Sequence, residues 1–193
     1  MSCVQLLQIT LAEDIKPDSS TVKTLIDKFR CATDNVKTVW DAQHEKPNII
    51  GIAAVWKSFE SQKVWVDSNE GKAAKSNIQN LSTGPIYDDT VLLSDDSIMP
   101  TLGAKIVEII SWIHLTEKVE GKKEAIEQGF WYFHNAIIGG APETEGGLVS
   151  GWGQAEFDFQ GVLSKRFTLL MDWRSVEAHY ACAEMKLFKE NLH

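Results

Sequence analysis

The spacing of apolar and polar positions changes several times along the first half of the chain. Apolar and polar residues alternate loosely in 3–11, where β-branched side chains are frequent, so this segment is predicted to be a strand. Residues 22–29 carry apolar side chains at helical spacing, and the segment 17–20 before them offers side-chain oxygens that can cap a helix. The same criteria predict strands at 36–43, 48–56 and 85–94, and a helix over about 58–81 that Gly71 could interrupt.

The second half repeats this order of elements. We expect strands at 105–115, 148–159 and 165–173 and helices at 122–138 and 175–190. Trp40 and Trp152 hold related places in their strands, and two pairs of segments match locally, 4–8 with 107–111 and 56–62 with 173–179. Turn-forming insertions at 139–147 and 160–162 lengthen the second half, which has no evident fourth strand after its last helix.

These patterns predict an α+β protein built from two related βαββα(β) halves. The halves are expected at 1–97 and 104–193, with a linker at 98–103. A chain of 193 residues, 44% of them apolar, is long enough to bury a core without a metal or disulfide staple.

The balance of charge excludes several classes of partner. With 19 Lys and Arg against 27 Asp and Glu, the net charge of −8 argues against a nucleic-acid binder and against an anionic membrane surface. The sequence contains no run of about 18 apolar residues, so no membrane span is predicted. Cys3, Cys31 and Cys182 are widely spaced and form no disulfide framework, so we expect a reducing, cytoplasmic setting.

The βαββα order, with a Trp at a strand end and a helix of the Ser-x-Glu-Ala type after it, resembles the dimeric α+β barrel superfamily. The segment 173–179 (Trp-Arg-Ser-Val-Glu-Ala-His) is similar to the one that follows the third strand in its antibiotic-biosynthesis monooxygenase-like and stress-responsive A/B barrel members. The resemblance implies two ferredoxin-like halves whose antiparallel sheets pack into one intramolecular α+β barrel. It also implies relatives that act without metal or flavin on aromatic, polyketide-like compounds.

The histidines of the second half are the first candidates for chemistry, because imidazole can act as acid or base near pH 7. His134 and His179 each lie at the flank of an apolar helix face, where they could border a cleft between helix and sheet, and His114 shares a strand face with Glu108. We rank His134 first, and expect Tyr132 or Arg166 to stabilise a developing oxyanion. A structural, hydrogen-bonded role is the alternative for each histidine.

Aromatic side chains are abundant enough to wall a cavity for a flat apolar ligand. The residues predicted to bind such a substrate are Trp112, Trp131, Phe130, Trp152 and Tyr180.

Other motifs are weaker. The glycine-rich stretch 147–153 fits neither a phosphate loop nor a nucleophile elbow, and His179 with Cys182 lacks the further ligands that a metal site needs. The acidic pairs 88–89 and 95–96 are expected to be solvated.

The sequence therefore predicts an enzyme without a cofactor that oxygenates, cyclises or isomerises a small apolar or aromatic molecule. A non-catalytic stress-responsive or ligand-binding barrel is the alternative, and haem binding is a third possibility that the resemblance allows. Because two fused halves can complete a barrel within one chain, we expect a monomer (a pseudo-dimer), with a homodimer as the alternative.

Overall fold

The computed structural model describes residues 2–93, 98–138, 147–186 and 189, and the chain divides into two compact units, Met1–Leu93 and Ser94–His193. The segment 98–103, expected as a linker, contains the short helix α4 (Ile98–Thr101), in which Ile98 and Thr101 are buried. Among the described residues, no helix is long and apolar enough to cross a membrane.

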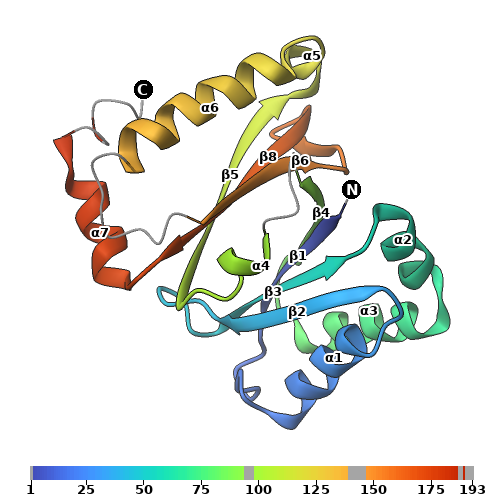
Figure 1. The fold of residues 1–193 in the computed structure, drawn as a ribbon. Coiled ribbons are helices and arrows are strands. Elements are labelled where there is room, and N and C mark those ends of the chain that lie inside the picture. The colour runs from blue at the N-terminus through green and yellow to red at the C-terminus, as the bar shows by residue number, and fades with distance from the viewer. Residues whose placement is uncertain (1, 94–97, 139–146, 187–188, 190–193) are drawn as a thin grey trace. The chain divides into compact units, whose positions relative to one another are not determined.

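The first unit is an antiparallel sheet of order β2-β3-β1-β4 with helices against one face (Figure 1). Its core lies between β1, β3 and the helices, where alternate strand residues face the apolar stripes of α1 and α3. The elements in chain order are β1 (Cys3–Thr10), α1 (Ser20–Arg30), β2 (Asn35–Ala42), β3 (Ile49–Trp56), α2 (Phe59–Asp67), α3 (Asn69–Leu81) and β4 (Tyr87–Leu93).

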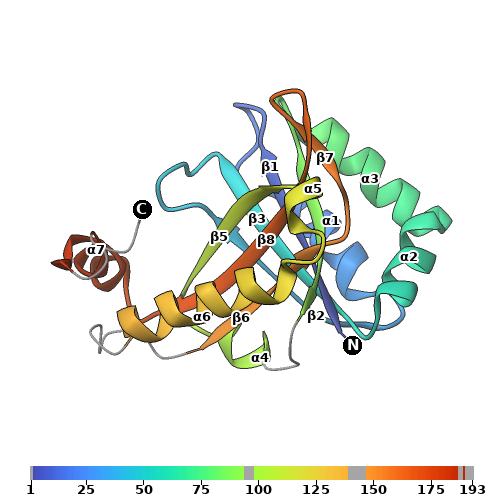
Figure 2. The same cartoon turned by 90° about the horizontal axis from the view of Figure 1, so that it is seen from above.

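The second unit has the sheet order β6-β8-β5, with β7 added to β8, and α6 runs along one face of this sheet (Figure 2). After α4 its elements are β5 (Ile106–Leu115), α5 (Thr116–Val119), α6 (Lys123–Ile138), β6 (Leu148–Gly153), β7 (Phe157–Phe159), β8 (Val162–Trp173) and α7 (Val176–Glu184). No described residue after α7 forms a counterpart of β4.

The register of the sheets confirms the internal repeat. Cys3 pairs with Trp56 in the first unit, and Ile106 pairs with Trp173 in the second, so β1 corresponds to β5 and β3 to β8. The predicted match of Trp40 with Trp152 is wrong by two residues. Trp152 pairs with Phe167, and Phe167 is the counterpart of Ile50 in the first unit. Ile50 pairs with Ala42, so Ala42 is the residue that corresponds to Trp152.

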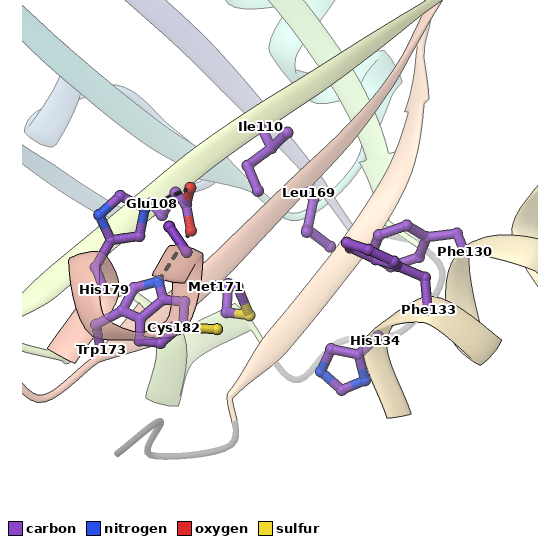
Figure 3. Close-up of a pocket in the computed structure, with 11 residues that line it drawn as sticks. Glu108, Ile110, Phe130, Phe133, His134, Leu169, Met171, Trp173, His179 and Cys182 are labelled. Atoms are coloured by element: carbon purple, nitrogen blue, oxygen red, sulfur yellow. Dashed lines mark hydrogen bonds and ion pairs between the residues drawn. The ribbon is translucent and has the colours of Figure 1, made fainter. Parts of the chain in front are cut away.

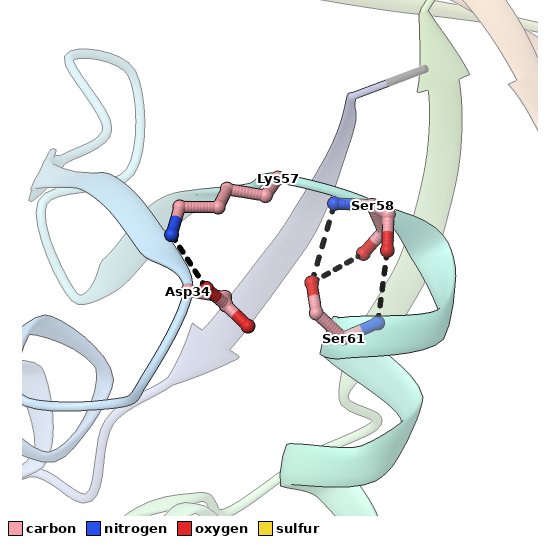
Figure 4. Close-up of polar contacts among 4 residues, drawn as sticks. All are labelled: Asp34, Lys57, Ser58 and Ser61. Atoms are coloured by element: carbon pink, nitrogen blue, oxygen red, sulfur yellow. Dashed lines mark hydrogen bonds and ion pairs between the residues drawn. The ribbon is translucent and has the colours of Figure 1, made fainter.

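The helix that follows β3 and the helix that follows β8 begin in the same way. The Ser58 hydroxyl caps α2 by accepting from the backbone N–H of Ser61 at 3.1 Å, and the Ser61 hydroxyl completes a capping box (Figure 4). Ser175 caps α7 through the N–H of Ala178 at 3.2 Å. Beside the first cap, Lys57 Nζ lies 2.6 Å from the Asp34 carboxylate on the surface of the unit (Figure 4).

The helix predicted over 58–81 is interrupted, but at Ser68 rather than at Gly71. Ser68 ends α2 and caps α3, accepting from the backbone N–H of Gly71 at 3.1 Å. Gly71 serves a different purpose, because a Cβ there would lie 2.1 Å from the backbone oxygen of Trp65. The glycine therefore permits close packing of α3 on α2.

The strand predicted over 148–159 is also two strands. Trp152 of β6 pairs with Phe167 and Phe157 of β7 pairs with Ser164, so the β6–β7 side has two extra residues and bulges between them. Both Gln160 and Gly161 have positive φ, and they form the predicted turn into β8.

The prediction that the acidic pair 88–89 is solvated holds for Asp88, which is exposed, and is wrong for Asp89. Asp89 is only 2% exposed, because the alternation of β4 places it on the same face as buried Val91. Asp88 accepts a hydrogen bond from Gln5 Nε2 at 3.0 Å. The pair 95–96 lies outside the described residues, as do residues 187, 188 and 190 of the helix predicted over 175–190.

Candidate functional site

A pocket lies between the helices and the sheet of the second unit (Figure 3). Its walls come from β5, α6, β8 and α7, and its volume is about 30 Å³. A single water needs roughly 10–15 Å³ on this measure, so the pocket has room for about two waters. An organic ligand must therefore move side chains aside to enter.

The floor of the pocket is apolar because strand residues alternate between the two faces of the sheet. Ile110 of β5 lies opposite Leu169 of β8, and Met171 follows on the same face. Phe130 and Phe133 of α6 close the floor from one side (Figure 3). This lining disfavours hydrophilic ligands and favours flat, apolar ones.

One wall holds a hydrogen-bonded cluster formed by Glu108, His179 and Trp173. Glu108 Oε1 lies 3.0 Å from His179 Nε2, and Glu108 Oε2 accepts from the indole Nε1–H of Trp173 at 2.9 Å (Figure 3). Trp173 is 1% exposed, whereas the side chains of Glu108 and His179 keep about a quarter of their surface. The glutamate thus fixes the imidazole of α7 against the strand.

The other wall holds His134, which is 9% exposed on α6. Neither ring nitrogen makes a hydrogen bond of good geometry to any residue that the structure describes. Its ring meets that of Trp131 edge-on at 5.3 Å and lies 6.4 Å from that of Phe130. Burial lowers the pKa of His134, the nearby Asn135 side chain acting in the opposite direction, so the imidazole is neutral at pH 7.

Cys182 borders the cluster from the next turn of α7. It is 3% exposed and carries a free thiol. Burial and the neighbouring Glu108 carboxylate both raise its pKa, so the group is a neutral thiol, not a nucleophilic thiolate. Its small side chain leaves space between α7 and the sheet.

The structure brings some of the sequence-predicted residues to this pocket and places others just behind it. His134, His179 and Phe130 line the pocket. A second layer contacts them: the Trp112 ring lies 5.2 Å from Phe130, the Tyr180 ring lies 5.2 Å from His179, and Trp131 packs on His134.

The remaining predicted residues lie elsewhere. His114 packs on Trp152 with ring centroids 5.6 Å apart, and burial lowers its pKa. Tyr132 is 78% exposed, because it lies on the outer side of α6. Arg166 lies on the opposite face of β8 from the pocket and stacks its guanidinium over Phe157 at 3.7 Å. Neither Tyr132 nor Arg166 lines this pocket.

Glu108 is the functional candidate that sequence reasoning overlooked. Its signal was a lone carboxylate among apolar residues on the inner face of β5, shared with Ile110 and Trp112. A buried-side carboxylate needs partners, and the sequence did not reveal that Trp173 and His179 supply them. Within the described part of the chain, no cluster of three or more His, Cys, Asp or Glu could hold a metal ion.

Comparison with known proteins identifies the fold. No family model matches the chain, and no curated protein matches it. A proposed monooxygenase of Lactobacillus acidophilus matches 99% of this chain and 85% of its own, with a TM-score of 0.54 at 9% identity. A proposed monooxygenase of Fusobacterium nucleatum matches 98% of this chain and 83% of its own, with a TM-score of 0.53 at 12% identity.

These likenesses extend over both units, and their low identity makes them evidence of fold alone. The chain has the dimeric α+β barrel fold of these two solved structures, with two ferredoxin-like halves in tandem.

Proposed function

We propose that the chain is an enzyme whose active site is the pocket of the second unit. Its substrate is a small phenolic or enolisable aromatic compound of polyketide type. The observation that carries this proposal is His134: a buried imidazole on the wall of an apolar pocket, whose ring nitrogens make no hydrogen bond of good geometry to a described residue. A buried polar group without a partner costs free energy, and such groups concentrate where a ligand supplies the partner.

His134 is suited to act as a general base. Its lowered pKa keeps a lone pair available at neutral pH, and the apolar surroundings strengthen any hydrogen bond to a ligand. A phenol or enol O–H would donate to this nitrogen and transfer its proton to it. The product is an electron-rich phenolate or enolate held between aromatic side chains.

His179 and Glu108 offer the complementary role on the other wall. A carboxylate bonded to one imidazole nitrogen orients the ring. The oriented His179 ring would face the negative charge that develops on the substrate. The two walls would thus share the work of removing a proton and stabilising the resulting anion.

For oxygenation the atoms balance without a reductant. The enolate carbon gives an electron pair to O2 and forms a C–O bond, and the peroxide takes up the proton and loses water to leave a carbonyl. A methylene group and O2 thereby become a ketone and water. Rearrangement or ring closure of the same anion would give isomerisation or cyclisation instead.

The pocket must widen for such a substrate. Met171 is the most adaptable lining residue, because its unbranched thioether side chain repacks easily. A non-catalytic binding module is the second candidate, and the small cavity together with the mutually satisfied Glu108 and His179 favours it.

The test uses anthrone, a tricyclic methylene ketone, with oxygen uptake and anthraquinone absorbance as readouts. We expect turnover by the full chain and a fall in kcat of about 10²–10⁴-fold in His134→Gln, the range for a lost general base. His44→Gln, in the surface turn of the first unit, is the matched control and keeps wild-type rates. Binding of anthrone without turnover would support the module, and loss of neither in His134→Gln would remove the proposed base.

A further inference from the structure

We infer that each chain holds one ligand site, in the second unit, and that Cys182 is the residue that keeps this site open. The corresponding space of the first unit is closed by Trp65. The inference concerns the pocket of the proposed function and takes from that proposal only the aromatic class of ligand. Three observations within the separate units carry it.

The first observation is the equivalence of positions across the repeat. In β1 and β3 Gln5 pairs with Ala54, and in β5 and β8 Glu108 pairs with Met171, two residues along from the equivalent pairs that contain Trp56 and Trp173. Glu108 therefore occupies the place that Gln5 has in the first unit. Both units thus have a polar residue at this place, a carboxylic acid side chain in the second unit and an uncharged amide in the first.

The second observation comes from the equivalent helices α2 and α7. Both begin at a capping serine directly after the strand, with the same bond to the third residue on, so positions can be counted from the cap. Four residues after Ser58 stands Gln62, and four after Ser175 stands His179. Seven residues after the caps stand Trp65 and Cys182.

The third observation is what Trp65 does. Its ring lies 4.8 Å from Phe29 of α1 and 5.0 Å from Trp56 of β3, and the residue is 8% exposed within the core of the first unit. The indole thus fills the space between the second helix and the sheet. At the same place Cys182 presents only a thiol, and the pocket lies beside it.

The two polar positions, occupied by Gln5 and Gln62 in the first unit, also differ from their counterparts in the second unit. Gln5 donates its amide to Asp88 on β4 at 3.0 Å, so it is engaged by a strand that has no described counterpart in the second unit. Gln62 is buried and cannot titrate. The first unit therefore has neither the space nor the acid–base pair, and its copy of the site is structural.

The test measures cavities directly with xenon, which enters small apolar cavities whatever reaction a protein catalyses. Crystals of the full chain under xenon pressure should show one xenon between α7 and the sheet of the second unit and none beside Trp65. Cys182→Trp should lose that xenon, and Cys182→Ala, the matched control, should keep it. Trp65→Cys should gain a xenon beside Phe29 and Trp56.

Cys182→Met gives a second measure should Cys182→Trp not fold, since it fills the cavity with a flexible side chain and should lower xenon occupancy. Fluorescence titration with 1-naphthol should show one site per chain, weakened at least tenfold in Cys182→Met and unchanged in Cys182→Ala. Xenon beside Trp65 in the wild type, or equal naphthol affinity in Cys182→Met and Cys182→Ala, would overturn the inference. Absence of anthrone turnover with these results intact would refute the proposed function alone.

Discussion

Removing Glu108 should expose how the cluster in the second unit is held together. Glu108→Leu deletes both acceptor oxygens, whereas Glu108→Gln keeps one acceptor oxygen, replaces the other with an amide donor and removes the charge. The two variants therefore separate the hydrogen bond to Trp173 from the interaction with His179. A difference between them reports on the buried indole N–H.

The magnitudes follow from burial. An orphaned donor in a residue as buried as Trp173 costs about 1–3 kcal/mol, and the partly exposed His179 interaction contributes at most about 1 kcal/mol, because water can replace the carboxylate there. Glu108→Leu should therefore lower the free energy of unfolding by about 1–4 kcal/mol. Glu108→Gln should cost about 1 kcal/mol, the difference between a charged and a neutral acceptor.

The assay is amide hydrogen exchange, read separately for the two units. Protection in the β5–β8 ladder should fall in Glu108→Leu, and the β1–β3 ladder serves as the internal reference. In a double-mutant cycle, Trp173→Phe should reduce the cost of Glu108→Leu by about 1–2 kcal/mol, because no N–H remains to be orphaned. If Glu108→Leu has the same effect in the wild-type and Trp173→Phe backgrounds, within about 0.5 kcal/mol, the hydrogen bond is refuted.

Three further predictions rest on other parts of the structure. Because burial lowers the pKa of His134, this histidine is protonated first in the unfolded chain as the pH falls below about 6.5. The free energy of unfolding should then drop by up to about 1.4 kcal/mol per pH unit. Urea titrations at pH 7 and pH 5.5 should show this drop, and His134→Phe should reduce it. Gly147→Ala should destabilise the second unit by about 1–3 kcal/mol in thermal denaturation, because the new Cβ would lie 2.0 Å from the buried Asp172 carboxylate, whereas Gly161→Asn at a positive-φ turn should cost little. Ser175→Ala should weaken protection in the first turn of α7 by about 1 kcal/mol and leave α2 unchanged, and equal loss in both helices would contradict the separate caps.

Much of the fold was predictable because it depends on local patterns. Strand alternation gave the order of elements in both halves, and the serines before α2 and α7 marked the helix starts through their capping chemistry. The local matches around Trp56 and Trp173 were confirmed by the register of two separate ladders. These features are set by neighbours in sequence.

The features that sequence reasoning missed depend on contacts between distant residues. Gly71 looked like a helix break, but its need for small size comes from the backbone of Trp65 on the preceding helix. Asp89 looked solvated, but the pairing of β4 with β1 determines which face it takes. Glu108 showed no motif, because its partners lie 65 and 71 residues away.

The two units offer a comparison that a single domain cannot. In both units helices pack on a sheet, and the two units share the strand register and the serine cap of the helix that follows. The first unit has a filled core around Trp65, so neither the sheet nor the cap requires a cavity at that place. The second unit leaves a cavity beside Cys182 and a buried imidazole whose ring nitrogens make no hydrogen bond of good geometry to a described residue, each of which lowers stability. Since folding alone does not require these costs, they are best explained by a ligand that fills the space and bonds to His134.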